Sequence, residues 1–432
     1  MIIDSYYSDI YLDPAMPSEF CELSDNESPP GDFQGAANEN LSKLKTEDAA
    51  RKKEKVARKQ KLLDLIAKSD VENLKKEALK EGLVDDDVRS EAWPLLLGLK
   101  GLPAWEPIDN DELQKHAEYN QVVLDVNRSL KRFPPSIEDS RRIAIQDELI
   151  VTILSILYRN KGLHYYQGFH DVAVTILLVV KSKMAGHIIE KISTEHLKPF
   201  LEPTMERTGR LLEYIYPLLE RLDHDLYEHL DESGVGTVFC LPWFITWFSH
   251  TIETYDILMR LFDYFLAYEF DPGSEYLLPL YLIVRIIEHR RNDVLETECE
   301  MAALHSLFYE PLDTLDFEEL LKKADKLYRL YPPESLRKEV EIRIRERLEI
   351  RMKNEDEYRR AVRNRRVARK NSKLPRFSKI IVLGFIGVAV VLTSMYFMRV
   401  KPTSFPFPLI RLQNFLRTQS YLWTFREDLE EN

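Results

Sequence analysis

The amino-acid sequence predicts an all-α protein: a multi-helix domain, then an amphipathic, basic linker helix and one C-terminal transmembrane helix. Glycine is scarce, with 14 residues among 432, which is under half of its usual share of roughly 7%. Tight β-hairpins and phosphate-binding loops depend on glycine, so both are disfavoured. Apolar residues recur instead at helical spacing through most of the chain. One later run, residues 380–398, contains no charged residue.

The first 45 residues are expected to form an acidic, disordered tail. Residues 1–42 contain nine Asp or Glu and no Lys or Arg. These acids are mixed with Pro, Ser, Gly and Asn, a composition that cannot bury enough apolar surface to fold. The segment also lacks the basic start and the continuous apolar stretch of a signal peptide.

The helical domain begins with two short helices whose ends carry recognisable signals. Ser69 followed by Glu72 fits a capping box, and the helix that it starts should end before Gly82. Asp85 or Asp86 would cap the next helix. That helix should continue through residue 97.

Longer helices follow from the apolar periodicity further along the chain. The segment 141–158 repeats apolar residues at helical spacing and predicts a broad buried face. Similar runs cover residues 211–230, 243–268 and 276–289. Together these segments predict a helical domain.

A charged linker, residues 335–379, separates this domain from the membrane-span candidate. Four apolar residues in it step by four among many charges, which predicts an amphipathic helix: Leu336, Val340, Ile344 and Leu348. Ten of the residues 359–379 are Lys or Arg and none is acidic. Such a run suits either membrane lipid or a nuclear-localisation or RNA-binding patch. Its position beside the apolar run favours membrane lipid.

Residues 380–398 form a candidate transmembrane helix of nineteen uncharged residues. At 1.5 Å per residue it would reach about 28 Å. That length is close to the roughly 27 Å core of the endoplasmic reticulum and short for a plasma membrane. A buried core helix is the alternative, although core helices seldom lack a polar face over this length.

The flanking charges predict the orientation of this single-pass span. Ten Lys or Arg precede it, whereas only Arg399 and Lys401 lie just beyond it. The positively charged side is expected to be cytosolic. The helical domain would then face the cytosol at an endoplasmic reticulum or early Golgi membrane, and residues 399–432 would form a short luminal tail.

Several functional classes are disfavoured by composition. The net charge of −12 argues against a general nucleic-acid binder. Three cysteines, Cys21, Cys240 and Cys299, lie far apart and contain no metal-type pair. Because no glycine-rich phosphate loop is present, we expect no cofactor or nucleotide bound by the chain itself. The chain could instead act on a nucleotide held by a partner.

Three short motifs point to such a partner. They stand in order within 80 residues of the helical domain. Each motif alone recurs by chance, whereas the three in this order and spacing are specific. Their sequences are Arg89-Ser-Glu-Ala-Trp93, Val122-Val-Leu-Asp125-Val-Asn-Arg128 and Tyr165-Tyr-Gln167-Gly168.

These motifs resemble the R-x-x-x-W, I-x-x-D-x-x-R and Y-x-Q-G signatures of the TBC domain of Rab GTPase-activating proteins. The resemblance covers residues 60–333 and implies that they form one such domain. The wider context is most similar to membrane-anchored members of that family. The resemblance implies a Rab-family small GTPase as partner, carrying GTP and Mg²⁺ and serving endoplasmic reticulum to Golgi traffic. Two positions depart from the family pattern. Val122 replaces the usual Ile, and Phe169-His170 stands where Met-Asn is common.

Arg128 is the candidate catalytic arginine. GTP hydrolysis needs stabilisation of charge on the transferring phosphoryl group, which an arginine supplied in trans can provide. Asp125 lies three residues earlier, so on a helix its carboxylate could hold or orient the guanidinium. On spacing alone an ordinary surface ion pair is the better interpretation, and the family resemblance reverses that preference.

Gln167 is the candidate second finger that the family resemblance implies. Its carboxamide can accept from the attacking water and donate to a phosphate oxygen. Without the motif, a loop-closing hydrogen bond would be the better interpretation. Tyr165 is expected to support the loop, and Gly168 to permit close approach of the partner. Arg89 and Trp93 are expected to be structural, with the indole in the core and the arginine tied to a nearby carboxylate.

The sequence therefore predicts a membrane-anchored activator of GTP hydrolysis by a Rab protein. The alternative is a non-catalytic membrane adaptor that binds a Rab or another trafficking protein through the same surface. The presence of both Arg128 and Gln167 favours catalysis. A third class, a lipid-binding or membrane-shaping protein, rests only on the basic run and the apolar run.

Overall fold

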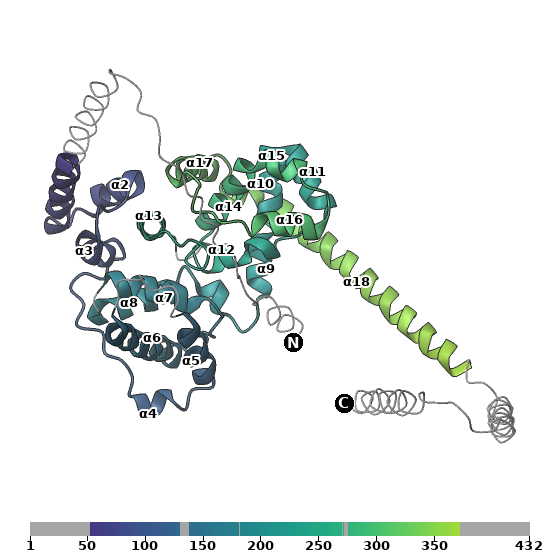
Figure 1. Ribbon diagram of the computed structural model, residues 1–432, viewed down its shortest axis with the longest axis horizontal. Coiled ribbons are helices and arrows are strands. Elements are labelled where there is room, and N and C mark those ends of the chain that lie inside the picture. Colours follow the sequence, from purple (N-terminus) through teal and green to yellow (C-terminus); the bar gives the residue numbers. More distant parts are fainter. Residues whose placement is uncertain (1–51, 130–137, 181, 270, 272–274, 372–432) are drawn as a thin grey trace, which may run out of the picture. The chain divides into compact units, whose positions relative to one another are not determined.

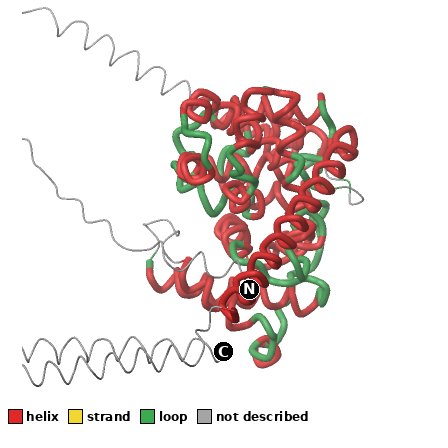
Figure 2. The backbone as a smooth tube through the Cα atoms, turned by 90° about the vertical axis from the view of Figure 1, so that its right-hand side faces the viewer, coloured by secondary structure: helices red, strands yellow, loops and turns green. Residues whose placement is uncertain are grey.

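The computed structural model describes residues 52–129, 138–180, 182–269, 271 and 275–371. Helices and loops make up all of this described part, without a strand (Figure 2). The predicted all-α class is therefore confirmed there. The predicted acidic tail and the residues from 372 onward, including the candidate span 380–398, lie outside the described residues. Within the described residues, no helix is both long and apolar enough to span a bilayer.

The N-terminal half of the domain carries the three motifs (Figure 1). After a helix over residues 52–67, its helices are α2 Val71–Glu81, α3 Asp86–Leu96, α4 Asn110–Leu113, α5 Tyr119–Arg128, α6 Asp139–Arg159, α7 Phe169–Val179 and α8 Ser182–Thr194. Helix α6 packs against both α5 and α7. The prediction of a helix over 141–158 is confirmed by α6.

The second half follows with shorter elements. They are η2 Lys198–Leu201, α9 Glu206–Leu212, α10 Ile215–Leu222, α11 His224–Glu232, η3 Val238–Cys240, α12 Leu241–Ile245, α13 Tyr255–Ala267, α14 Leu278–His289, α15 Arg291–Glu296, α16 Met301–Phe308 and α17 Phe317–Leu330. Buried residues of α14 and α17 face each other, and α13 packs against α2 and α3. The two halves thereby share one core.

Helix α2 corrects the predicted capping box. Asp70, not Ser69, caps it, and the Asp70 carboxylate accepts a hydrogen bond from the backbone N–H of Asn73. Ser69 lies just before the cap with a φ of +53°, a left-handed turn that redirects the chain. The predicted end is confirmed, since Gly82 follows α2 with a φ of +74°.

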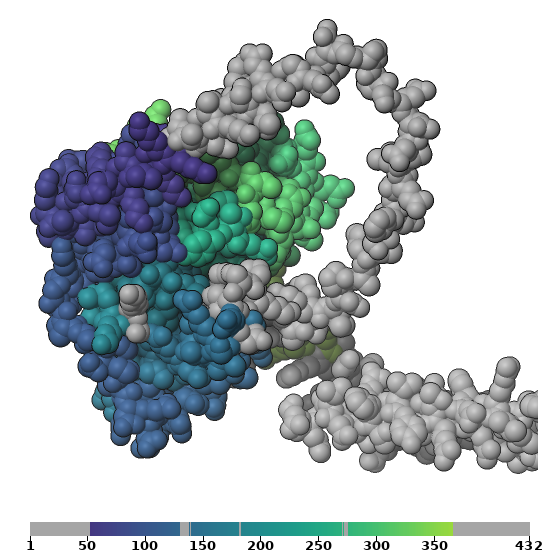
Figure 3. All heavy atoms as spheres, turned by 60° about the vertical axis from the view of Figure 1, so that its left-hand side comes forward, coloured from purple at the N-terminus to yellow at the C-terminus, as the bar shows by residue number. Residues whose placement is uncertain are grey.

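Two arginines cover the C-terminal carbonyls of α2. Arg58, from the helix over 52–67, donates to the carbonyl of Gly82 at 2.7 Å. Arg260 of α13 donates to the carbonyl of Leu79 at 2.9 Å. Positive charge at a helix C-terminus is favourable. The first helix is thereby fastened to α2. Figure 3 shows the purple N-terminal part of the described chain packed against the blue part that follows it.

The predicted runs 211–230 and 243–268 are each divided in the structure. The first becomes parts of α9, α10 and α11, with Asp223 capping α11. The second is broken between α12 and α13, where Trp247 and Phe248 adopt φ values of +50° and +66°. Both rings are fully buried. Apolar residues continue across these breaks, so their periodicity alone gives no sign of the turn.

The domain continues beyond residue 333 into α18, Pro333–Asn371. Leu336 and Val340 of its first turns belong to the domain core. Arg343 forms an ion pair with Glu213 at 3.1 Å and lies 3.7 Å from the ring centroid of Tyr216. The compact unit accordingly reaches Ile344.

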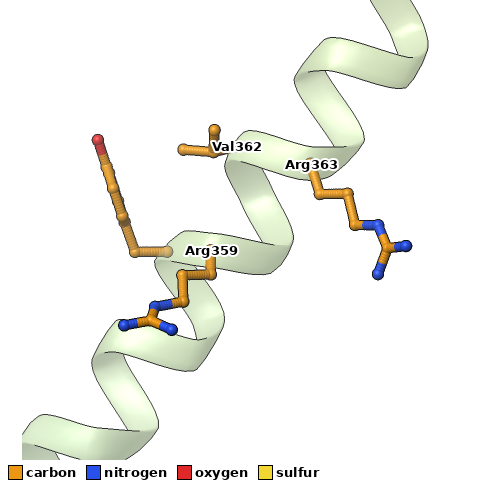
Figure 4. A pocket seen from close by; sticks show the side chains of 4 residues that line it. Arg359, Val362 and Arg363 are labelled. Carbon is orange, nitrogen blue, oxygen red and sulfur yellow. The ribbon is translucent and has the colours of Figure 1, made fainter.

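The second unit begins at Arg345, and its described part is the remainder of α18. Side chains of residues 345–361 are mostly exposed. A shallow hollow on this helix is lined only by Tyr358, Arg359, Val362 and Arg363 (Figure 4). Since all four side chains come from one helix, they do not form an enclosed ligand site.

Candidate functional site

Arg128 is the last residue of α5 and its side chain is exposed. Val122 and Val126, on the opposite face of α5, are fully buried and fix the helix in the core. The Val126 carbonyl accepts hydrogen bonds from the Ser129 hydroxyl at 2.7 Å and from the Gln146 amide of α6 at 3.2 Å. The end of α5 is thus held firmly while Arg128 extends from it.

Asp125 does not hold Arg128 in the structure. Its carboxylate is buried and accepts hydrogen bonds from Nε2 of Gln121 at 3.1 Å. Among the residues that the structure describes, Arg128 forms no ion pair, with Asp125 or any other residue. The expected contact between the two is therefore not observed, because the Asp125 side chain turns into the domain and Arg128 turns outward.

Gln167 is exposed in the turn that precedes α7. The residues before it are fastened to other parts of the domain. The Tyr166 hydroxyl donates to the carbonyl of Ile245 at 2.6 Å, and the backbone N–H of His164 donates to the carbonyl of Leu201 at 2.7 Å. A rigid loop thus presents an outward-facing carboxamide.

Gly168 is required by two features of this turn. Its φ is +105°, a conformation that residues with a Cβ rarely adopt. A Cβ at this position would lie 2.8 Å from Cγ2 of Thr246. The glycine therefore allows the turn to pack closely against the segment that follows α12, and it places Gln167 at the start of α7.

Tyr165 joins the second and third motifs. Its side chain is partly buried, and burial raises its pKa well above the usual value. The negative charge of Asp125 raises this pKa further. The Tyr165 hydroxyl also lies 2.8 Å from Nδ1 of His170. Helix α5, which ends at Arg128, also packs against α7, which begins directly after Gln167 and Gly168.

The first motif lies in a different polar cluster, centred on Asp263 of α13. Arg89 forms an ion pair with this fully buried carboxylate at 3.1 Å, and Trp93 donates its indole N–H to it at 2.8 Å. The backbone N–H of Leu83 donates at 2.7 Å. Arg89 also pairs with Asp86 at 2.8 Å. This is the geometry expected of structural residues.

Several residues near the candidate fingers were not singled out from the sequence. Gln121 contacts Asp125, and Asp171 and His250 lie 2.8 Å apart. His170 departs from the family pattern, and the sequence assigns it no role. Asp171 and His250 carry no motif signal, and only the fold brings them together. In the described part, no three His, Cys, Asp or Glu side chains form a candidate metal site.

Comparisons with known proteins show the family of this chain. The family model of the Rab-GTPase-TBC domain matches residues 86–295. Human TBC1 domain family member 20 is 39% identical over 292 residues, covering 67% of this chain and 70% of that protein. The GTPase-activating protein gyp10 of Schizosaccharomyces pombe is 28% identical over 282 residues, covering 63% and 73% of the two chains.

The fold also resembles a solved structure. The crystal structure of the Ypt/Rab-GAP domain of Gyp1p matches with a TM-score of 0.51 and 14% identity, covering 64% of this chain and 99% of that one. The chain therefore belongs to the Rab-GTPase-TBC domain family, whose domain defines the Rab GTPase-activating proteins. All three motifs lie within the matched residues.

Proposed function

We propose that this chain stimulates GTP hydrolysis by a Rab GTPase of early secretory traffic, with Arg128 and Gln167 as fingers in trans. The observation that carries the proposal is the packing of α5, which ends at Arg128, against α7, which begins directly after the Gln167–Gly168 turn. Both candidate fingers are exposed on elements that are well anchored. GTP and Mg²⁺ arrive with the Rab.

Arg128 would stabilise the charge that develops on the transferring phosphoryl group. An arginine supplied in trans contributes about 10³ to 10⁵ in rate in related GTPase systems. Within the described ranges no ion pair holds Arg128. No described residue therefore has to release the guanidinium before it reaches the phosphates. Its anchored helix lowers the entropy lost on docking.

Gln167 would orient the attacking water. Its carboxamide accepts a hydrogen bond from water through oxygen and donates to a phosphate oxygen through nitrogen. The bonds of Tyr166 and the conformation of Gly168 hold its backbone in one arrangement. This preorganisation suits a residue whose contribution depends on position more than on charge.

A direct test uses the full chain in detergent with a panel of purified Rab proteins. Each Rab is loaded with GTP, and phosphate release is followed in a single turnover. The proposal expects strong acceleration for a subset that serves the endoplasmic reticulum and Golgi. If a Rab binds tightly but GTP hydrolysis is not accelerated for any Rab of the panel, the result would support the adaptor alternative and contradict the proposed activator function.

We further propose that residues 380–398 anchor the chain in the endoplasmic reticulum or early Golgi membrane. The basic residues of the segment 359–379 would bind membrane lipid. The support is the length of the apolar run and the ten-to-two charge difference across it. Protease added to intact microsomes should digest the domain and spare a tag placed after Asn432. Digestion of that tag would contradict the orientation.

A further inference from the structure

His250 is a partly exposed histidine that the fold places beside the turn of Gln167. Its Nδ1 lies 2.8 Å from Oδ2 of Asp171, a carboxylate in the first turn of α7. The backbone N–H of Asp171 donates to the carbonyl of Gly168 at 3.0 Å. Gly168 directly follows Gln167. One residue of α7 therefore links the imidazole to the turn that carries the candidate finger.

The segment before His250 forms a second link to the same turn. Thr246 packs so closely against Gly168 that a Cβ on the glycine would lie 2.8 Å from Cγ2 of the threonine. Oγ1 of Thr246 accepts a hydrogen bond from the backbone N–H of His250 at 3.2 Å. The two links run through different elements, α7 and the segment after α12, and both end at the turn of Gln167. His250 is therefore fixed on the Gln167 side of the candidate site.

Two residues in a rare backbone conformation lead the chain to His250. Trp247 and Phe248 have φ values of +50° and +66°, which are uncommon for large side chains. Both rings are fully buried, whereas the side chain of His250, two residues later, is 47% exposed. Conformations of this kind persist where the surrounding structure imposes them, and they cluster at functional sites. The turn buries the two aromatic rings and leaves the imidazole at the surface.

The hydrogen bond to Asp171 determines which nitrogen of His250 is left for a partner. Asp171 is only 2% exposed, and a second imidazole, that of His170, lies 3.5 Å from its other oxygen. A carboxylate only accepts hydrogen bonds, so Nδ1 of His250 carries the proton. In a neutral ring with that tautomer, Nε2 is an acceptor. Among the described residues, none donates a hydrogen bond to this Nε2.

We propose that His250 binds the Rab, with Nε2 accepting a hydrogen bond from an N–H or O–H group on the surface of the GTPase. A GTPase whose nucleotide site receives Gln167 must cover the surface next to that turn, and His250 lies there. The inference rests on the proposed function and adds a docking contact to it. His250 takes no part in the chemical step. Asp171 fixes the orientation of its ring.

Matched substitutions separate the two nitrogens of this imidazole. His250→Asn keeps an amide near the position of Nδ1, which can still donate to Asp171, and it removes the acceptor at Nε2. His250→Gln places an amide near the position of Nε2 and keeps an acceptor there. His224→Asn is the control, since this exposed histidine also contacts a carboxylate, that of Glu228, at 3.2 Å. His224 lies in α11, which packs against α10 and α15.

The readout separates docking from chemistry. Single-turnover hydrolysis by a Rab that the chain activates is measured over a range of full-length chain concentrations. We expect His250→Asn to raise the half-saturating concentration roughly two- to tenfold, as for the loss of one hydrogen bond. The maximal rate should stay unchanged, because the contact is the same in the ground state and the transition state. His250→Gln should recover most of the affinity, and His224→Asn should behave like the unaltered chain.

Chemical modification of the unaltered chain tests the same contact without a substitution. Diethyl pyrocarbonate modifies accessible imidazoles, and mass spectrometry locates the modified residues. The reagent is applied to the full-length chain alone and with a saturating amount of the Rab carrying GDP and aluminium fluoride, which mimics the transferring phosphoryl group. The bound Rab should protect His250 and leave His224 reactive.

Two results would overturn the docking role of His250. The first is a folded His250→Asn chain with an unaltered half-saturating concentration, or with a loss of maximal rate alone. The second is equal modification of His250 with and without the bound Rab, a measurement that remains decisive if the variants fail to fold. If the unaltered chain neither binds nor activates any Rab, the proposed function itself fails, and the docking contact fails with it.

Discussion

The Asp263 cluster and the finger region both contain motif residues, yet their side chains lie in opposite environments. Asp263 is fully buried and receives hydrogen bonds from Arg89, Trp93 and Leu83. Arg128 and Gln167 are exposed. In the first region, every observed hydrogen bond joins two residues of the domain. In the second, the charge and the carboxamide point outward from elements that are themselves firmly held.

This difference separates stability from activity. Removing one partner of a buried ion pair leaves an uncompensated charge, which costs about 3 to 5 kcal/mol. Removing an exposed side chain with no internal partner costs little stability. Substitutions in the Asp263 cluster should therefore act on the amount of folded protein. Substitutions at Arg128 should act on hydrolysis by folded protein.

Arg128→Ala should give the largest effect. We expect the stimulated rate to fall by three to five decades, or about 4 to 7 kcal/mol of activation free energy. The melting temperature should not change. Arg128→Lys should rescue poorly, because an ammonium cannot form the planar two-pronged contact. Single-turnover phosphate release provides the rates. Full activity in Arg128→Ala would remove this arginine from the mechanism.

Asp263→Ala tests whether the Asp263 cluster determines stability. It leaves Arg89 buried without its partner, so the free energy of unfolding should fall by about 3 to 5 kcal/mol. Chemical denaturation measures this loss. Activity per folded molecule should be retained. Asp256→Asn, at an exposed position of the same helix α13, is the control and should leave stability within about 0.5 kcal/mol.

Gly168→Ala should affect both properties, because this position supports the finger loop. The left-handed conformation and the close approach of Thr246 should together cost about 1 to 3 kcal/mol, with a lower maximal rate. Adding Thr246→Ser removes the clashing methyl group and should restore part of the loss. Gly209→Ala is the control, since that glycine lies in α9 with open space around it. It should be neutral or slightly stabilising.

Asp70→Ala should give the smallest effect and tests the corrected cap of α2. Loss of the hydrogen bond to the Asn73 N–H should lower the melting temperature by roughly 2 to 4 °C. Ser69→Ala should lower it less, because Ser69 does not cap the helix. Calorimetry of the two variants is sufficient. Equal losses would indicate that the predicted capping box has a role after all.

Helices with local boundary signals were predicted well from the sequence. Asp85 caps α3, Gly82 follows α2, and α6 covers the predicted run 141–158. These signals depend on neighbouring residues alone. The divided runs were not predictable in this way, because the turn at Trp247 and Phe248 is stabilised by burial of both rings against distant helices.

The candidate site shows the same difference between local features, which the sequence predicts, and long-range contacts, which it does not. The motifs single out Arg128, Gln167 and Gly168 as candidates; the first two are exposed, and the glycine packs closely against Thr246. The hydrogen-bond partners of the motif residues could not be predicted from the sequence, since Arg89 and Asp263 are 174 residues apart in the chain. Asp125 shows the limit most plainly. Its spacing suggested an ion pair with Arg128, whereas the fold turns it toward Gln121 and Tyr165.

The central claim is that two exposed side chains of this chain, Arg128 and Gln167, complete the GTPase site together. Single-turnover hydrolysis should be compared for a Rab with its own switch glutamine and for the same Rab with alanine there. Each is measured with the unaltered chain and with Gln167→Ala. We expect the altered Rab to remain strongly activated by the unaltered chain, and Gln167→Ala to abolish most stimulation of both Rab forms. If Gln167→Ala is fully active while the altered Rab no longer responds, Gln167 is a loop residue and the two-finger account is wrong.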